Sequence, residues 1–160
     1  MEIRKAGKKL INKKKTIFEA EKLYKSIIEE ISNQGFIYAE KEQRFKPTQY
    51  GDETRFIILG FKSRDSFAKT KLTITVKLED INKIKKDNRK LDEGNINILI
   101  EGEVNLDYND DWNKSGLKRF LFKIYTKYLK KEEIKQKYMV PTFKDVGIIY
   151  KKLKEDLNLY

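Results

Sequence analysis

The chain has 160 residues, with 36 Lys and Arg against 25 Asp and Glu, so its formal net charge is +11. It contains no Cys and no His, which excludes disulfides, Cys/His zinc sites and every catalytic triad that needs a thiolate or an imidazole. Nineteen Ile, nine Phe and nine Tyr exceed what a disordered polycation carries, so we expect a folded core.

The composition also narrows the expected partners and location. Of the basic residues, 30 are Lys and six are Arg. Since Arg is the better side chain for bidentate recognition of base edges, sequence-specific reading of nucleic acid is disfavoured. No apolar run is long enough to cross a bilayer and no secretory leader begins the chain, so we expect no transmembrane segment and a cytoplasmic location. Nothing in the sequence implies a cofactor.

Residues 1–15 are predicted to be a basic arm or an edge strand, followed by a single domain over 16–160. Only Glu2 opposes the positive charge of this segment, whose basic residues are Arg4, Lys5, Lys8, Lys9, Lys13, Lys14 and Lys15. The segment is therefore the first candidate for contact with a polyanion.

A helix is predicted over 16–34. Thr16 and Glu19 have the spacing of a capping box, and Gly35 is suited to end the helix. The apolar residues that follow recur at helical spacing, namely Ala20, Leu23, Tyr24, Ile27, Ile28 and Ile31.

The middle of the chain reads as antiparallel strands over 36–45, 55–61, 68–78 and 95–107. Residues 81–94 are expected to be a charged connection with a turn at Asp87 and Asn88. The third strand should bury Leu72, Ile74, Val76 and Leu78. The fourth should bury Ile96, Ile98, Ile100, Gly102, Val104 and Leu106, and should expose Asn97, Glu101, Glu103, Asn105 and Asp107.

The last third is predicted to be helical over 116–130 and 143–157. Ser115 is the expected N-cap of the first of these helices, and Pro141 is expected to end it. Its predicted core stripe is Leu117, Phe120, Leu121, Ile124, Tyr125, Tyr128 and Ile134. Thr142 and Asp145 are predicted to start the last helix, which should be buried through Val146, Ile149, Tyr150, Leu153 and Leu157.

This order predicts an α+β fold. We expect a two-layer sandwich in which an antiparallel sheet of four to five strands carries the N-terminal helix and the C-terminal helices on one face.

The C-terminal two thirds resemble a family of small archaeal proteins of unknown function. The segments that carry the resemblance are Asp65-Ser66-Phe67, Asp107-Tyr108, Trp112-Asn113-Lys114-Ser115, the helix with Tyr125, Lys127 and Tyr128, and Leu157-Asn158-Leu159. The match covers about residues 55–160 and departs from the family at Gly116, where members often have Pro, and in the basic last helices. The resemblance implies this order of elements and an archaeal source, and it implies no activity.

Acidic residues are concentrated between Leu91 and Asn113, a stretch without Lys or Arg. They are Asp92, Glu93, Glu101, Glu103, Asp107, Asp110 and Asp111. One interpretation is that a basic strand at 69–78 lies beside them and neutralises them across the sheet. Another is an oxygen-rich Mg²⁺ or Ca²⁺ site at Asp107, Asp110 and Asp111, although the EF-hand spacing is absent.

The penultimate helix carries a basic ridge at helical spacing, defined as Arg119, Lys123, Lys127, Lys130 and Lys131. Like charges one turn apart repel each other, so an anionic partner would relieve them. The ridge is either a solvated helix face, or a contact surface for a nucleic-acid backbone or an anionic membrane.

The first functional hypothesis is therefore a non-enzymatic basic binding module. It would contact RNA or a ribonucleoprotein surface through the N-terminal basic residues and the basic ridge. One alternative is a structural or assembly protein that forms homo-oligomers by setting its acidic strand against basic helices. Another is a helix-grip fold that binds a small ligand or a lipid between sheet and helix.

Overall fold

The computed structural model describes residues 2–158 and, within them, every side chain except those of Tyr128 and Leu129. The predicted places of Tyr128 in the core stripe and of Leu159 in the resemblance therefore lie outside the described part. In chain order the elements are β1 (Glu2–Phe18), α1 (Ala20–Asn33), β2 (Ile37–Thr48), β3 (Gly51–Ser63), β4 (Ala68–Lys86), β5 (Arg89–Leu106), η1 (Asp111–Asn113), α2 (Gly116–Ile124), η2 (Tyr125–Leu129), α3 (Lys131–Ile134), η3 (Lys135–Met139) and α4 (Val140–Asp156).

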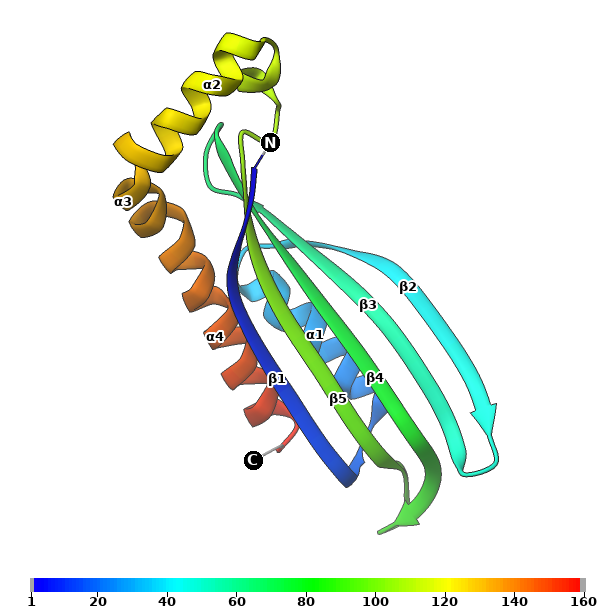
Figure 1. The fold of residues 1–160 in the computed structure, drawn as a ribbon. Helices are drawn as coiled ribbons and strands as arrows, with labels where there is room; N and C mark the ends of the chain where they lie inside the picture. Colours follow the sequence, from blue (N-terminus) through cyan, green and yellow to red (C-terminus); the bar gives the residue numbers. More distant parts are fainter. Residues whose placement is uncertain (1, 159–160) are drawn as a thin grey trace.

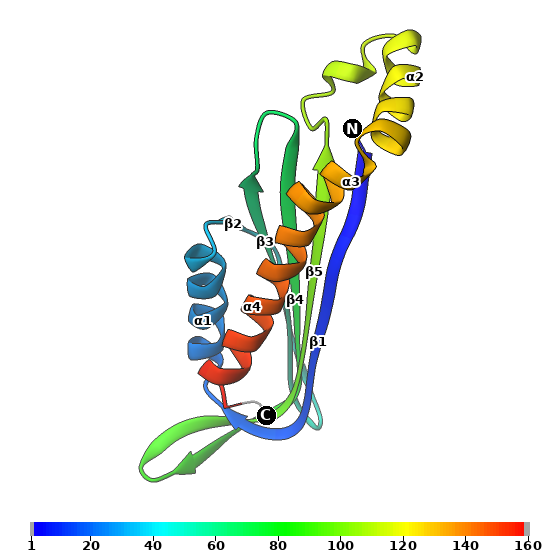
Figure 2. The ribbon, with the colours of Figure 1, turned by 90° about the vertical axis from the view of Figure 1, so that its left-hand side faces the viewer.

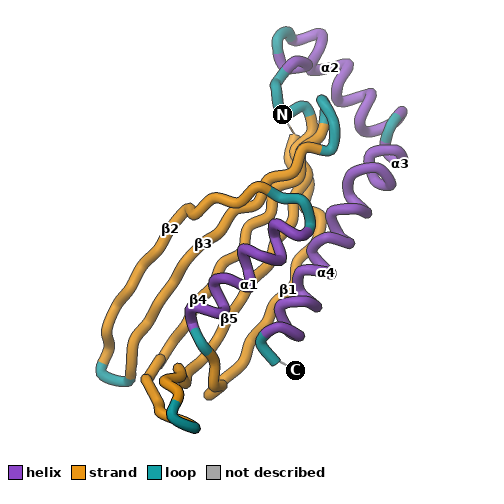
Figure 3. Tube along the Cα trace, turned by 180° about the vertical axis from the view of Figure 1, so that it is seen from behind, coloured by secondary structure: helices purple, strands orange, loops and turns teal. Residues whose placement is uncertain are grey.

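The strands form one five-stranded antiparallel sheet in the order β1-β5-β4-β3-β2. The helices α1 and α4 lie side by side on the same face of this sheet, as Figures 1 and 2 show. The view from behind in Figure 3 shows both helices in front of the curved strands. The predicted α+β class, with its antiparallel sheet and its N-terminal and C-terminal helices, is confirmed.

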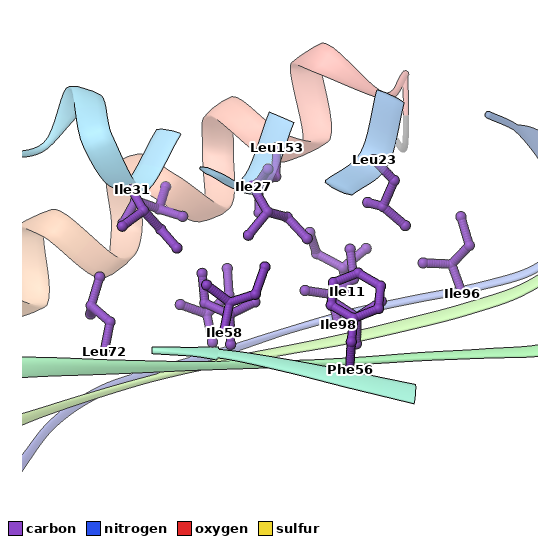
Figure 4. Close-up of a cluster of buried hydrophobic side chains, with 14 of the residues drawn as sticks. Ile11, Leu23, Ile27, Ile31, Phe56, Ile58, Leu72, Ile96, Ile98 and Leu153 are labelled. Atoms are coloured by element: carbon purple, nitrogen blue, oxygen red, sulfur yellow. The ribbon is translucent and has the colours of Figure 1, made fainter. Parts of the chain in front are cut away.

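The core fills the space between the sheet and these two helices. Leu23, Ile27 and Ile31 of α1 are fully buried against sheet residues such as Ile58 and Ile98. Figure 4 shows these side chains meeting across the two layers. Each fully buried side chain of this size contributes about 1.5–3 kcal/mol through burial, so the cluster is the main source of stability.

The predicted alternation in β4 and β5 is confirmed. Ile98 and Ile100 are fully buried, whereas Glu101 on the opposite face is partly exposed, so the register was read correctly. The prediction that Asp107 is exposed is wrong. Its backbone is left-handed, with φ of 52°, and its carboxylate is buried because it caps the turn that follows β5.

The predicted start of α1 is wrong. β1 continues to Phe18, and Thr16 is paired with Gly94 in the sheet rather than capping a helix. The first N–H of α1, at Ala20, donates instead to Oδ2 of Asp92 at 3.0 Å. A buried carboxylate from β5 thus satisfies the helix terminus.

The segment 81–94 is not a connection, because its two halves pair with each other as extensions of β4 and β5. The turn at Asp87 and Asn88 is confirmed, and both residues have positive φ, as a two-residue hairpin turn requires.

The C-terminal helices also differ from the prediction. Pro141 begins α4 instead of ending a helix, since it lies in the first turn, where no N–H is needed, after the π-helical turn η3. Thr142 and Asp145 therefore lie inside a helix, where they are buried. Arg64 donates to Asp145 at 2.6 Å, which links the end of β3 to α4.

Where α4 crosses the sheet it passes very close to Gly102. A Cβ atom at this position would lie 2.7 Å from the Ala6 carbonyl oxygen and 2.8 Å from a methyl group of Val146. The glycine therefore permits the close contact of α4 with β1 and β5.

None of the helices within the described residues is long and apolar enough to cross a bilayer.

Candidate anion-binding cavity

The helix α2 presents the opposite face to the protein from the one predicted. Three members of its predicted core stripe are exposed, Leu117 by 68%, Phe120 by 60% and Leu121 by 44%. Ile124 and Tyr125 are half-buried, and among the members whose side chains the structure describes, Ile134, in α3, is the one that is buried as predicted. Three members of the basic ridge instead line a cavity between the helix and the start of β1, namely Arg119, Lys123 and Lys127.

This cavity has a volume of about 490 Å³ and is lined by residues far apart in the sequence. Four basic side chains contribute to it, Arg4 from β1 and Arg119, Lys123 and Lys127 from the helix. The remaining lining residues are Glu2, Asp107, Trp112, Asn113, Phe122 and Thr126. The two segments predicted to bind a polyanion thus contribute to one site, through Arg4 and the ridge.

The sheet positions Arg4. Pairing of β1 with β5 sets Arg4 opposite Val104, whose side chain is buried on the helix side of the sheet. Arg4 therefore also points to that side. Its Nε donates to Oε1 of Glu2 at 3.0 Å, so part of its charge is compensated.

Asp107 orients the aromatic wall of the cavity. Its two carboxylate oxygens accept the backbone N–H groups of Asp111 at 2.9 Å and Trp112 at 3.0 Å. The Trp112 ring then stacks on Tyr125, with ring centroids 5.7 Å apart and planes 19° apart. The cavity consequently combines cations with the rings of Trp112 and Phe122.

The hydrogen bonds of Asp107 involve one of the three residues of the candidate Mg²⁺ or Ca²⁺ site, Asp107, Asp110 and Asp111. Both oxygens of Asp107 already accept N–H groups, and Asp111 pairs with Lys114 at 3.0 Å. Across residues 2–158, no group of three or more acidic side chains is placed to hold a metal ion. Asp107 acts here as a cap for the turn before α2.

The charge of the cavity is uneven. Glu2 compensates Arg4, and Asp107 is occupied by backbone donors. Arg119 and Lys123 are exposed and form no ion pair within the described part of the chain. These two cations are therefore the groups most available to an incoming anion.

The other predicted basic residues lie elsewhere. Lys5 and Lys8 stand opposite Glu103 and Glu101 on the far face of the sheet, and Lys9 lies over the ring of Tyr150. Lys130 pairs with Glu133 at 2.6 Å, and the hydrogen bond with this carboxylate raises the pKa of Lys130. Lys13, Lys14 and Lys15 lie at the other end of β1. Lys131 lines a second hollow, which shares Arg4, Thr126 and Lys127 with the cavity.

The acidic strand is flanked by basic strands on both sides. β5 lies between β1 and β4, so that Glu103 has Lys5 opposite it on one side and Lys71 on the other. The Nζ of Lys71 lies 3.9 Å from the Glu103 carboxylate. The expected neighbour for the acidic segment, a basic strand at 69–78, is confirmed.

Sequence reasoning missed the role of Asp65, which joins the β3–β4 turn to η3. Its carboxylate accepts the N–H groups of Phe67 and Ala68 and the hydroxyl of Tyr138, and it pairs with Lys137 at 3.1 Å. Burial by itself would raise the pKa of Asp65, but these hydrogen bonds outweigh it and lower the pKa to about 2. The spacing of Asp65 before Phe67 was a detectable sign of an Asx turn.

Two of the segments that carry the resemblance, Asp65-Ser66-Phe67 and Asp107-Tyr108, meet at this turn. Tyr108 donates its hydroxyl to the Asp65 carbonyl oxygen at 2.9 Å, and the Asp107 N–H donates to the Phe67 carbonyl oxygen at 2.7 Å. Comparison of the chain with protein-family models and with curated proteins gives no match in either case.

Proposed function

We propose that the chain is a basic binding module for RNA and that a single-stranded segment enters the cavity between β1 and α2. The observation that carries the proposal is that Arg4 and three members of the basic ridge line one cavity, although 115 positions separate Arg4 from Arg119. In this proposal Arg119 and Lys123 contact phosphate oxygens, with Arg4 at the opposite wall.

The shape of the site favours a single strand. The cations line a concave site, whereas the phosphates of a duplex lie on a stiff convex surface. A flexible strand can place a phosphate inside and stack a base on an aromatic side chain such as Trp112 or Phe122. Asn113, also on the wall, offers a polar contact for a ribose hydroxyl.

The alternatives gain less support from the same structure. In the assembly hypothesis the acidic strand contacts a neighbour's basic helix, yet Glu101 and Glu103 already lie beside lysines of their own sheet. A helix-grip site requires space between the sheet and α4, and that region is filled by fully buried side chains such as Ile98 and Ile149.

A paired-variant titration tests the proposal. The double variant Arg119→Gln with Lys123→Gln removes two cavity charges, and Lys14→Gln with Lys15→Gln removes two charges from the far end of β1, about 30 Å away. Binding of each to a labelled single-stranded RNA is measured by anisotropy at several salt concentrations. We expect the cavity variant to flatten the slope of log K against log[salt] by about 1.4, at about 0.7 per lost contact.

The far-end variant should retain the wild-type slope, because its lysines do not reach the cavity. Equal losses in both variants would mean that RNA is attracted by net charge alone. Failure of the wild-type chain to bind RNA at low salt would reject the proposed function.

A further inference from the structure

The outward face of α2 is apolar and unoccupied by any described part of the chain. Leu117, Phe120 and Leu121 stand on this face, opposite the side that lines the cavity. Figures 1 and 2 show α2 at the tip of the molecule, beyond the end of the sheet. An extended flat surface can therefore reach this face without meeting the rest of the protein.

The charge around this apolar face has one sign. From Trp112 to Lys131 the chain has seven basic residues and no acidic one. At 100° per residue, Lys118 lies on one side of the apolar face, and Lys123 lies on the other, at the border with the cavity. The helix is thus amphipathic, with a polar edge that is purely cationic.

We propose that α2 docks on the surface of an anionic phospholipid membrane. Leu117, Phe120 and Leu121 would enter the boundary between headgroups and acyl chains, while Lys118 and Lys123 would contact the phosphates of the headgroups. Cationic helices with Leu and Phe on one face bind in the plane of such an interface, and each nearby Lys adds to the attraction.

Charge and area both favour a lipid surface over a second copy of the chain. Two copies meeting through α2 would bring together two segments that each carry seven positive charges. A stable protein interface uses about 20–30 residues on each side, far more than one face of this nine-residue helix supplies. A membrane needs only a few inserted side chains when electrostatic attraction assists them.

The membrane proposal does not depend on the RNA proposal. Lys123, at the border, takes part in both, but the apolar residues Leu117, Phe120 and Leu121 belong to the membrane proposal alone, and Arg4 and Arg119 belong to the RNA proposal alone. Removing the apolar side chains leaves the cavity residues Arg4 and Arg119 in place. RNA affinity and vesicle binding can therefore be measured separately on the same variants.

Vesicle flotation tests the proposal. The full chain is mixed with vesicles of phosphatidylcholine alone, or with vesicles in which phosphatidylglycerol replaces part of the phosphatidylcholine. We expect the wild type to float with the anionic vesicles only. The variant Leu117→Ser with Phe120→Ser should bind them at least about tenfold more weakly, since two inserted side chains are lost.

The matched control is Ile37→Ser with Phe45→Ser, which removes two apolar side chains of β2 that are exposed by 77% and 65%. It should bind anionic vesicles as the wild type does. Lys118→Gln should weaken binding most at low salt, because added salt screens the attraction that the lysine supplies. Absence of wild-type binding, or equal binding by both double variants, would overturn the proposal. It would also be overturned by a wild-type dimer, seen by light scattering, that Leu117→Ser with Phe120→Ser abolishes.

Discussion

The body and the tip of this molecule use amphipathic helices in opposite ways. In the body, formed by the sheet with α1 and α4, the apolar faces of both helices point inward and meet the sheet. At the tip, the apolar residues Leu117, Phe120 and Leu121 of α2 are exposed, and it is Arg119 and Lys123, exposed as well, that line the cavity beside β1. A helical repeat therefore specifies that two faces exist, while the neighbouring elements decide which one is buried.

The elements packed against each helix explain why α1 buries its apolar face and α2 does not. α1 lies over strands whose inward side chains are Ile, Leu and Val, so burial of its apolar face is favourable. α2 extends beyond the sheet and faces Arg4 and the capped turn at Asp107. On this side α2 packs through Phe122, whose ring lies near those of Trp112 and Phe67, and the other side chains that line the cavity are polar or charged.

The largest expected effect is a difference in the free energy of unfolding between two variants, each of which replaces one large aliphatic side chain by Ala, one in the body and one in the tip. Ile98→Ala should lower the free energy of unfolding by about 3 kcal/mol, because it opens a cavity in a fully packed core. Leu117→Ala should change it by no more than about 0.5 kcal/mol, because the side chain is already in solvent. Urea unfolding of both variants measures the difference. A loss at Leu117 as large as that at Ile98 would mean that α2 packs inward in solution.

Local sequence signals predicted most of the body. The alternation from Leu72 to Leu78 identified a half-buried strand, and Ser115 identified a helix start that the structure confirms, with its hydroxyl accepting the N–H of Lys118 at 3.1 Å. What local signals missed are contacts between distant residues. Asp92 caps α1 from 72 positions away, and Arg64 reaches Asp145 from 81 positions away. No pattern within a short window encodes such pairs.

The sequence predicted which basic residues belong to the candidate site, but it did not predict that they lie close together in space. Arg4 and Arg119 were both selected for their charge, but their meeting depends on β1 being the neighbour of β5, the strand that leads into α2. That Arg119, Lys123 and Lys127 of the ridge lie beside Arg4 was not predicted, because the helical repeat does not show which element α2 lies against.

A smaller effect is expected from the pH dependence of folding stability, which Glu30 introduces at the contact between α1 and α4. Burial raises the pKa of Glu30 to about 7, and its hydrogen bond with Asp156 and the charges of Asp156 and Glu29 add to the rise, against an opposing effect of Lys152. The folded state therefore holds the proton more tightly than the unfolded state, so stability from this group is full below pH 4.5 and is lost as pH rises to about 7.

Glu30→Gln should remove this dependence. The variant should equal or exceed the wild type in melting temperature above pH 7, where the wild type holds an additional charge beside Asp156, and should lose that advantage near pH 4.5. The measurement is the melting temperature across this pH range. Leu117→Ala, in the tip, should melt with the same pH profile as the wild type, and a profile of Glu30→Gln identical to both would contradict the raised pKa.

The smallest expected effect tests whether the tip unfolds independently of the body. Ser115→Ala removes the side-chain acceptor for the N–H of Lys118, a change that costs a helix about 1 kcal/mol. Because α2 packs chiefly on its own flanking turns η1 and η2, we expect this cost to appear as faster amide hydrogen exchange within 116–124 and not as a shift of global unfolding. Exchange in α1 should stay at the wild-type rate. If α1 exchanged faster as well, the tip and the body would unfold as one cooperative unit, and α2 would be less independent of the core than its exposed apolar face indicates.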